Sequence, residues 1–306
     1  MKLLITGATG QIGWQLQRTL APLGDVTALT RAELDLAEPE RAAAVVREMR
    51  PDILLNAAAY TGVDKAEAEP ELAETVNAVA PCRLAQELAQ SGGLMIHYST
   101  DYVFDGSKAG PYSEDDATGS LNVYGASKLR GEQGIAGTGC AHIILRTSWI
   151  YDTRGKNFLR TVLRLAREKE ELRMVDDQHG APTWARAVAE CTAAIVARCA
   201  GPSGDRSWRP TGVYHLTAQG STTWAGFART ILDEYNALLE WPADFGEFTG
   251  PLLAKRVVPI TSALFKAPAR RPKNSVLSNA KLKRDFGLQL PGWRQLLRLA
   301  MLDTIR

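Results

Sequence analysis

A tyrosine and a lysine separated by three residues form the most informative chemical pattern in the chain. They are Tyr124 and Lys128, at the two ends of the segment 124–128. On a helix, residues four apart lie on one face, one turn apart. A lysine there favours the phenolate and lowers the tyrosine pKa from about 10, so that the phenol can act as a general acid or base. The same pattern also occurs by chance on exposed helix faces.

A hydroxyl group upstream of this pair strengthens the catalytic interpretation. Ser99 and Thr100 end a predicted strand in the segment His97-Tyr98-Ser99-Thr100-Asp101. The carboxyl ends of parallel strands are where ligands bind in open α/β sheets. Both hydroxyls are candidates to hydrogen-bond a substrate oxygen, and we select Thr100. The predicted catalytic set is therefore Thr100, Tyr124 and Lys128.

Three glycines near the N-terminus indicate a dinucleotide site. Gly7, Gly10 and Gly13 lie in Gly7-Ala8-Thr9-Gly10-Gln11-Ile12-Gly13, between a predicted strand and a predicted amphipathic helix. Glycine permits a tight turn and lets backbone N–H groups approach a pyrophosphate at the positive end of the helix. A glycine trio alone also fits a simple strand-to-helix turn. Its place after a strand and before a helix favours the dinucleotide.

The residues after the second and third strands predict the kind of dinucleotide. Thr30-Arg31 follows the second strand, where a basic residue accommodates the phosphate of NADP and an acidic one favours NAD. We therefore expect NADPH, with NADH as the alternative and a solvated surface arginine as the simpler reading of Arg31. Asp35-Leu36 would flank the adenine. The small residues of the stretch 56–61 suit a backbone that passes close to a cofactor; they include Ala57, Ala58 and Ala59, with Tyr60 and Thr61 after them.

The elements that must position these residues alternate in type along the first half of the chain. We predict strands at 2–6, 26–29, 53–56, 94–99 and 141–146, and helices at 11–23, 39–50, 71–91 and 122–133. This alternation indicates an α/β fold, a Rossmann-type doubly wound parallel sheet with right-handed crossovers. In the second half we predict helices at 157–168, 185–199 and 224–239, short strands at 172–175 and 213–216, and a loop at 200–212. We expect residues 1–150 to form mainly the NAD(P)-binding domain. Residues 151–306 would form mainly a smaller C-terminal substrate-binding lobe, with some segments returning to the first domain.

Composition excludes several classes of function. The chain has 306 residues and a formal net charge of +2, so bulk charge suggests neither nucleic acid nor a membrane surface as a partner. No apolar run is long enough to span a bilayer. The apolar N-terminus runs directly into glycines without a cleavage pattern, so we interpret it as a buried strand rather than a signal peptide. Four scattered cysteines fit buried thiols in a reducing cytoplasm, and we expect a cytoplasmic location.

Longer motifs extend over nearly the whole chain and carry a family resemblance. They are GATGQIG, NAAAYTGVDKAEAEPELAETVN, HYSTDYVFDG, LNVYGASK and RTSWIY, with later segments at 177–183 and 271–275. They resemble the extended short-chain dehydrogenase/reductases and, more narrowly, the dTDP-4-dehydrorhamnose reductases. The glycine turn is shared by the superfamily, whereas STDYVFDG and RTSW are specific to the subgroup.

The resemblance implies roles for individual residues. Gln11, Ile12 and Gly13 would hold the pyrophosphate, and Lys128 would bind the nicotinamide ribose and tune Tyr124. Thr100, Asp101 and Trp149 would contact the sugar nucleotide, and Arg271 would pair with a substrate phosphate. A core aromatic and a surface arginine are the simpler readings of Trp149 and Arg271. Asp35 and Leu36 would contact the adenine, and Ala59, Tyr60 and Thr61 would line the cofactor path.

The chain departs from the resemblance at a magnesium site. Family members often carry glutamates for magnesium at a dimer contact, whereas here Gln15 and Arg294 stand at two of the positions and Glu190 at the third. A lone carboxylate is a poor site for a hard dication. We therefore predict no metal ligands and expect magnesium to be absent, which makes the homodimer it would support a weaker expectation.

The predicted reaction is reduction of the C4 keto group of dTDP-4-dehydro-β-L-rhamnose by hydride transfer from NADPH. Another nucleotide-sugar 4-ketoreductase or a 4-epimerase is an alternative on the same scaffold. A 4,6-dehydratase would carry Glu after Asp101, where this chain has Tyr102, and an epimerase-reductase would carry a cysteine there. A non-catalytic regulatory subunit of a methionine adenosyltransferase is a further alternative, against which the intact hydroxyl, tyrosine and lysine argue.

Overall fold

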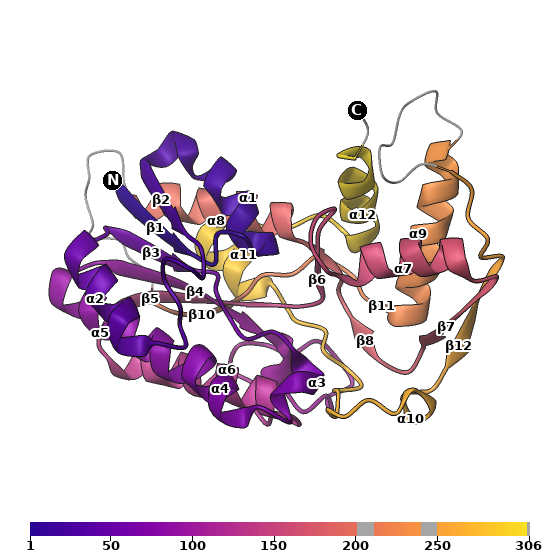
Figure 1. Ribbon diagram of the computed structural model, residues 1–306, viewed down its shortest axis with the longest axis horizontal. Helices are drawn as coiled ribbons and strands as arrows, with labels where there is room; N and C mark the ends of the chain where they lie inside the picture. The colour runs from indigo at the N-terminus through magenta and orange to yellow at the C-terminus, as the bar shows by residue number, and fades with distance from the viewer. Residues whose placement is uncertain (201–210, 240–249, 305–306) are drawn as a thin grey trace.

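Six parallel strands form the central sheet of the computed structural model (Figure 1), which describes residues 1–200, 211–239 and 250–304. Their order across the sheet is β10-β5-β4-β3-β1-β2. The strands are β1 (Lys2–Thr6), β2 (Asp25–Leu29), β3 (Ile53–Asn56), β4 (Leu94–Thr100), β5 (Ala141–Thr147) and β10 (Gly212–His215). The N-terminal segment is thus a buried interior strand, as predicted. The expected doubly wound parallel sheet is confirmed.

The direction of strand order reverses between β1 and β3. From β1 the chain crosses to β2 on one side and then to β3 on the other. Ligands bind in the crevice outside the carboxyl ends of the strands at such a switch point. The glycine turn follows β1 and the Ala-rich loop follows β3, so both predicted cofactor segments lie at this crevice.

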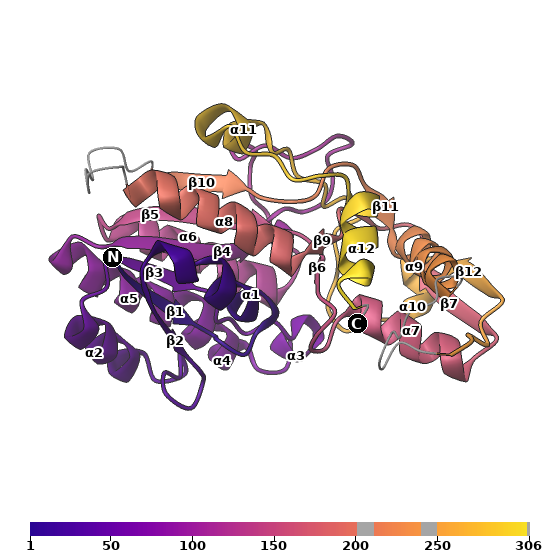
Figure 2. The ribbon, with the colours of Figure 1, turned by 90° about the horizontal axis from the view of Figure 1, so that it is seen from above.

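Helices cover both faces of the sheet, with α1 and α8 on one face and α2, α5 and α6 on the other (Figures 1 and 2). On this side of the molecule the helices are α1 (Gln11–Thr19), α2 (Pro39–Met49), α3 (Val63–Ala66), α4 (Pro70–Glu74), α5 (Ala80–Ser91), α6 (Val123–Gly137), α8 (Ala185–Ala200) and α11 (Ala280–Phe286), with the short turns η1 (Ala21–Leu23), η2 (Thr75–Val79) and η3 (Asp101–Val103). Successive side chains of a strand point to opposite faces. In β1, Leu3 and Ile5 therefore pack toward α1 and α8, whereas Leu4 packs toward α2 and α5.

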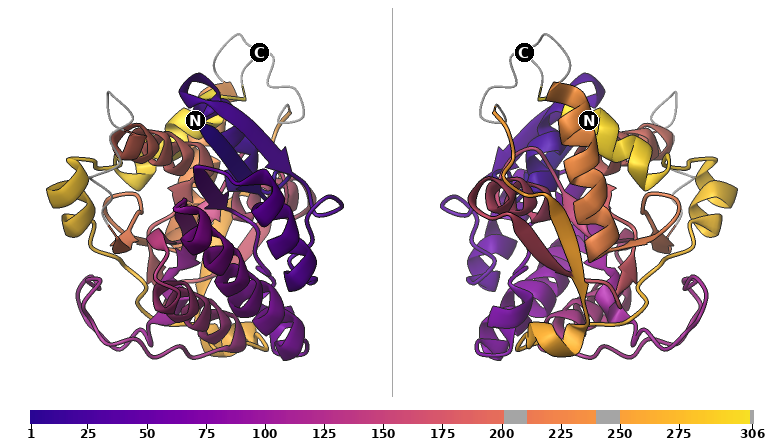
Figure 3. Two further views of the ribbon diagram at one scale, coloured as in Figure 1. Left: turned by 90° about the vertical axis from the view of Figure 1, so that its left-hand side faces the viewer. Right: turned by 90° about the vertical axis from the view of Figure 1, so that its right-hand side faces the viewer.

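The smaller lobe lies beside the carboxyl edge of the sheet (Figure 1), and its elements α9 and β12 face the viewer in the right panel of Figure 3. Its helices are α7 (Phe158–Glu168), α9 (Trp224–Leu239), α10 (Ser262–Phe265) and α12 (Trp293–Leu302), and its strands are β6 (Ile150–Tyr151), β7 (Glu171–Val175), β8 (His179–Gly180), β9 (Thr183–Trp184), β11 (Thr222–Thr223) and β12 (Arg256–Ile260). These strands pair two by two rather than forming one sheet. From the second half of the chain, α8, β10 and α11 join the sheet side.

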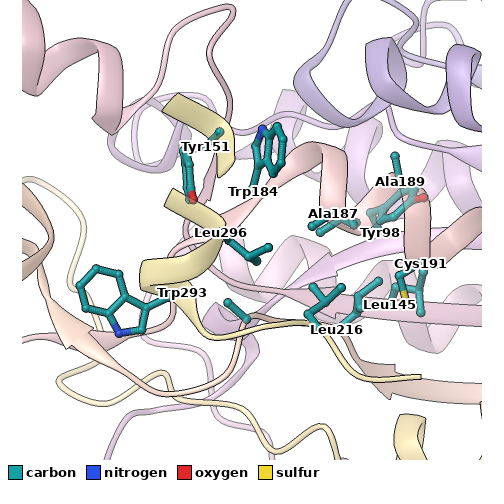
Figure 4. Packing of buried hydrophobic residues seen from close by; sticks show 14 of the residues in the cluster. Tyr98, Leu145, Tyr151, Trp184, Ala187, Ala189, Cys191, Leu216, Trp293 and Leu296 are labelled. Carbon is teal, nitrogen blue, oxygen red and sulfur yellow. The ribbon is translucent and has the colours of Figure 1, made fainter. Parts of the chain in front are cut away.

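One apolar cluster passes without a break from the sheet into the lobe. It extends from Tyr98 and Leu145 on the strands, past Trp184, to Trp293 and Leu296 of α12 (Figure 4). The two parts therefore share one packed core.

Two predicted helices differ from the structure because of proline. The helix expected at 11–23 ends at Thr19 and continues as the 3₁₀ turn η1, because Pro22 has no N–H for a helical bond. The helix expected at 71–91 begins at Pro70 and contains the π turn η2, which ends at Val79, two residues before Pro81. A wider turn removes the clash between the proline ring and the preceding turn's carbonyl. The loop expected at 200–212 falls largely on 201–210, outside the described residues.

Candidate functional site

The glycine turn leaves no room for side chains. Gly7 has a φ of +69°, and a Cβ on it would lie 2.8 Å from the backbone of Ala58. A Cβ on Gly13 would lie 2.1 Å from the carbonyl oxygen of Gly7, and one on Gly10 would lie 3.2 Å from the same oxygen. The turn thus presents bare backbone at the N-terminus of α1, whose positive end attracts a pyrophosphate. These residues fit the expected dinucleotide.

The end of β2 places the predicted adenosine-binding residues close together. Arg31 donates from Nε to Oδ2 of Asp35 over 3.0 Å, and its side chain is 77% exposed. Thr30 donates from its backbone N and its hydroxyl to Glu33, a carboxylate that the sequence analysis did not single out. Leu36 is buried in the core on the α2 and α5 face. The guanidinium therefore stands at the sheet edge, restrained by one carboxylate and open to an approaching phosphate.

The backbone of the loop after β3 is hydrogen-bonded by Asn77, which was not among the predicted site residues. Asn77 of η2 accepts from Tyr60 N over 2.8 Å and donates to Tyr60 O over 3.0 Å. Its amide also donates to the Ser127 hydroxyl on α6. The Tyr60 hydroxyl donates to Glu69. Asn77 thus connects the loop of Ala57–Thr61 to the helix that carries Tyr124 and Lys128.

Tyr124 and Thr100 meet at the carboxyl end of β4. Asn122 caps α6 by accepting from Gly125 N over 2.8 Å, which fixes the first turn, where Tyr124 lies. Burial raises the pKa of Tyr124 to about 12, and a hydrogen bond with Thr100 lowers it. The expected lowering of this pKa by Lys128 is therefore not what the structure gives: desolvation disfavours the phenolate and dominates.

Asp101 anchors Thr100 from the other side. The Thr100 hydroxyl donates to Asp101 Oδ1 over 3.1 Å, and the Ser148 hydroxyl donates to Oδ2 over 2.9 Å. Burial raises the pKa of Asp101 to about 6, while hydrogen bonds from Ser275, Ser148 and Thr100 lower it. The carboxylate is 3% exposed, so it orients the Thr100 hydroxyl beside the Tyr124 phenol.

Lys128 is held by two residues of β4 rather than by Tyr124. Its Nζ donates to the Tyr98 carbonyl over 2.6 Å and lies 3.0 Å from His97 Nε2. Burial lowers the pKa of Lys128 to about 8, against an opposing effect of Glu132. His97 and its neighbour Asn56 were not among the predicted site residues. The sequence signal that marks them is a polar residue inside, or at the end of, an otherwise apolar strand.

Arg271 reaches the same edge from the C-terminal part of the chain. Its Nη2 lies 2.8 Å from Oδ2 of Asp64 on α3, and its Nη1 donates to the Ala269 carbonyl. It also hydrogen-bonds Tyr102, whose ring meets that of Tyr124 edge to face at 6.0 Å. The predicted phosphate-binding arginine thus lies one aromatic ring away from the predicted acid. Asp64 and Tyr102 were not singled out, because more than 160 residues separate each from Arg271.

Trp149 lies between the sheet and the lobe. Its ring stacks on Trp224 with centroids 3.5 Å apart and an interplanar angle of 5°. A Cβ on Gly180 would lie 2.4 Å from a carbon of the same ring, so glycine at this position makes room for it. Trp149 has a φ of +47°, a strained backbone that occurs at functional sites more than elsewhere. Trp224, which opens α9, extends the aromatic surface beyond the predicted residue.

The three positions considered for magnesium have other partners. Gln15 is buried and donates to Asp152 over 2.8 Å, Glu190 pairs with Arg186, and Arg294 lies over the Trp293 ring. Within the described residues, no group of three or more His, Cys, Asp or Glu side chains is placed to hold a metal ion. All four cysteines are present as thiols; Cys140, Cys191 and Cys199 are buried and Cys82 is half-buried.

Comparison with known proteins gives one consistent result. The family model of the RmlD substrate binding domain matches residues 1–305. A dTDP-4-dehydrorhamnose reductase of Burkholderia thailandensis is 48% identical over 305 residues, which cover 100% of this chain and 99% of that protein. The enzyme of the same name from Escherichia coli K12 is 43% identical, covering 96% of this chain and 95% of that protein.

A solved structure agrees with these sequences. The dTDP-4-dehydrorhamnose reductase of Bacillus anthracis, crystallised in complex with NADP, superposes with a TM-score of 0.86 at 33% identity, covering 99% of this chain and 100% of that one. The match includes the lobe as well as the sheet. The chain belongs to the dTDP-4-dehydrorhamnose reductase family.

Proposed function

We propose that this protein reduces the C4 keto group of dTDP-4-dehydro-β-L-rhamnose to the alcohol of dTDP-β-L-rhamnose. The observation that carries the proposal is the contact between the Thr100 hydroxyl and Tyr124 at the carboxyl end of β4, the same edge of the sheet at which the glycine turn follows β1. Family membership supplies the substrate, because the relatives at 48% and 43% identity are named for this reaction. The enzyme class is an NAD(P)H-dependent oxidoreductase.

The chemistry needs a hydride and a proton at the two ends of one carbonyl. When bound, NADPH supplies the hydride to C4. Tyr124 gives its phenolic proton to the oxygen of the same carbonyl, and the Thr100 hydroxyl turns its one proton from Asp101 to that oxygen. With a pKa of about 12 the phenol is protonated at neutral pH and so begins as the acid. Before the substrate binds, Asp101 accepts the Thr100 proton and so orients the hydroxyl. Lys128 carries its positive charge one helical turn from Tyr124.

Binding is divided between the two sides of the crevice. The cofactor would lie on Gly7, Gly10, Gln11, Ile12 and Gly13, along Ala57–Thr61, with Tyr124 and Lys128 at its nicotinamide end. Thr30, Arg31 and Asp35 would surround its adenosine, whereas the side chain of Leu36 is buried in the core and leaves only its backbone for this contact. Asp101, Trp149 and Arg271 would contact the sugar nucleotide, with the lobe contributing Trp149's stacking partner. We favour NADPH over NADH because Arg31 stands exposed at the end of β2.

The lobe's role, the assembly and the location complete the proposal. We assign the sugar nucleotide to the lobe and the dinucleotide to the sheet side, and expect a cytoplasmic enzyme that does not depend on magnesium. Whether it forms a homodimer is left to experiment. Within the described residues, no helix is long and apolar enough to cross a membrane. Gel filtration with light scattering, with and without a chelator, tests the assembly.

The first experiment is NADPH consumption by the purified protein with enzymatically prepared dTDP-4-dehydro-L-rhamnose. Rapid oxidation that yields dTDP-rhamnose supports the proposal. Absence of oxidation with both NADPH and NADH, from protein that binds cofactor, contradicts it. The absorbance of the protein before assay separates a 4-epimerase, which retains its nicotinamide through purification, from a reductase, which releases it. A stable complex with a methionine adenosyltransferase and no turnover would support the regulatory alternative instead.

A further inference from the structure

A chain of buried polar side chains runs beneath the site and ends at Lys128. The Thr6 hydroxyl lies 2.6 Å from Asn56 Oδ1, Asn56 Nδ2 lies 3.0 Å from His97 Nδ1, and His97 Nε2 lies 3.0 Å from Lys128 Nζ. These four side chains are at most 1% exposed. They come from β1, β3, β4 and α6, so this series of hydrogen-bonded side chains crosses three adjacent strands and then reaches the helix.

The protonation states along this chain depend on one another. Burial and the charge of Lys128 hold the pKa of His97 well below its usual range, so the imidazole is neutral. A charged ammonium has no lone pair and can only donate, so His97 Nε2 must accept. The proton of the neutral ring then lies on Nδ1 and must find an acceptor. Asn56 provides this acceptor when its amide is flipped, so that Oδ1 rather than Nδ2 faces His97 Nδ1. The O and N atoms of an amide are nearly indistinguishable, so the flipped orientation fits the structure equally well.

Two contacts account for two of the three donors of Lys128 among the described residues. They are the Tyr98 carbonyl and His97 Nε2. The third N–H has no hydrogen-bond partner among the described residues. Because Nζ is fixed at two points, the third donor has a defined direction. Loss of the His97 contact would leave a buried ammonium with one protein acceptor.

We propose that His97 is a positioning residue for Lys128, with Asn56 fixing its ring so that Nε2 serves as the acceptor for the ammonium. Thr6 at the far end also accepts from Ala58 N in the cofactor loop, over 3.3 Å. The series of hydrogen-bonded side chains therefore connects the loop after β3 to Lys128 of α6. This inference rests on the proposed function, because it takes Lys128 to act in catalysis.

A simpler role for His97 is a buried polar residue that merely satisfies its neighbours. His142 on β5 is such a residue: it is buried, and its Nδ1 meets only the carbonyl of Cys140, two residues away. It makes no contact with a charged group in the described structure. A comparison of the two histidines therefore separates positioning of Lys128 from general stability.

Several charged or titratable groups share the surroundings of Lys128. Glu132 lies one turn further along α6 and forms a buried ion pair with Arg146 of β5, and Tyr124 lies one turn back. Asp101 faces Tyr124 from η3. Substitution at His97 leaves these four groups in place. A change in the pH dependence of turnover then reports the loss of the acceptor itself.

The test compares His97→Leu, His97→Gln and the matched control His142→Leu, each as the full chain. Turnover and KM for the ketosugar are measured from pH 6 to 10, with Tm as a check on folding. Removing an acceptor disfavours the charged form of Lys128 and so lowers its pKa. In His97→Leu, the fall of kcat at high pH should therefore occur about one pH unit lower than in wild type, and kcat should be reduced about tenfold. His97→Gln, whose amide oxygen can reach Nζ, should recover most of both effects. His142→Leu should leave the limb unmoved.

The inference is overturned when His97→Leu lowers Tm as His142→Leu does but keeps the wild-type basic limb. A second measurement needs no folded variant. In wild-type protein with ¹⁵N-labelled histidine, the chain's four histidines are resolved by long-range ¹H–¹⁵N spectra. We expect a neutral His97 with the proton on Nδ1; a proton on Nε2 at pH 7 overturns the proposal. Wild-type turnover, measured first, tests the proposed reaction separately from the tautomer.

Discussion

At the carboxyl edge of the sheet the side chains are polar, buried and paired, whereas the opposing surface of the lobe is built from stacked aromatic rings. On the sheet side, Thr100, Asp101 and Lys128 each have hydrogen-bond partners inside the protein. On the lobe side, Trp149 lies flat on Trp224, which in turn meets Phe158 at 4.6 Å. The edge of the sheet and the neighbouring lobe thus differ in physical character.

The difference indicates a division of labour. Hydrogen bonds are directional, so a buried network fixes individual atoms where a proton must move. Aromatic stacking is less directional and shapes a surface through area and contact. We therefore expect substitutions on the sheet side to change the rate of the chemical step, and substitutions on the lobe side to change the affinity for the sugar nucleotide.

The strongest challenge to this division is Tyr124→Phe, which removes one oxygen from the sheet side. Loss of a positioned general acid should reduce kcat by roughly 10²- to 10⁴-fold. The affinity for NADP⁺, measured by fluorescence titration, should stay unchanged because the ring remains. Tyr112→Phe is the control, since that hydroxyl donates to Asp105 and accepts from Lys108 N and, among the described residues, forms no hydrogen bond with Thr100, Tyr124 or Lys128. Near-normal turnover in Tyr124→Phe would refute the assignment of the acid.

On the lobe side, Gly180→Ala sharpens the comparison with a smaller effect. The added methyl would lie 2.4 Å from the Trp149 ring, which must shift against Trp224. Overpacking of this kind costs about 1–3 kcal/mol of stability. We expect KM for the ketosugar to rise about tenfold while kcat changes little, as a lost contact of about 1.4 kcal/mol would give.

Gly110→Ala is the matched control for this substitution, because a Cβ at Gly110 meets nothing within 4 Å. Steady-state kinetics over a range of ketosugar concentrations separates KM from kcat. A fall in kcat with an unchanged KM would place Trp149 in the chemical step and break the division between the two surfaces.

The sequence predicts the sheet side better than the lobe. The strands at 2–6 and 53–56 match the structure at both ends, since apolar runs between turn residues are a local property. The two-residue strands β6, β8, β9 and β11 carry no periodicity, and neither they nor helices α10 to α12 were predicted. The π turn before Pro81 depends on how one proline meets the preceding turn, which no repeat reveals.

The candidate site shows the same contrast. Tyr124, Lys128 and Thr100 are recognisable because their spacing and their strand end carry the chemistry. His97, the partner of Lys128, cannot be recognised from the sequence, because it contacts the lysine only when β4 and α6 pack together. The direction of the Tyr124 pKa shift was also missed, since burial outweighs the lysine, and the extent of burial is a property of the folded chain.

The third prediction concerns stability rather than turnover, at the buried carboxyl group of Asp101. Its pKa is raised from 3.8 to about 6 by burial, so between these values the folded state binds a proton that the unfolded state has lost. The native state is therefore favoured as pH falls through 6 and disfavoured as pH rises. Two pKa units correspond to about 2–3 kcal/mol. The free energy of unfolding of Asp101→Asn should rise relative to wild type by about 2 kcal/mol between pH 4 and pH 7.

Asp105→Asn is the control of opposite sign, four residues further on. Hydrogen bonds from Ser107 and Tyr112 hold the pKa of Asp105 below its usual range, so its contribution to stability is present at neutral pH and lost as pH falls through the folded pKa. Relative to wild type, the stability of Asp105→Asn should therefore fall as pH rises from 3 to 7. Urea denaturation at each pH measures both differences. If the difference in free energy of unfolding between Asp101→Asn and wild type does not change with pH, the hydrogen bonds from Thr100 and Ser148 fully offset the effect of burial on the Asp101 pKa.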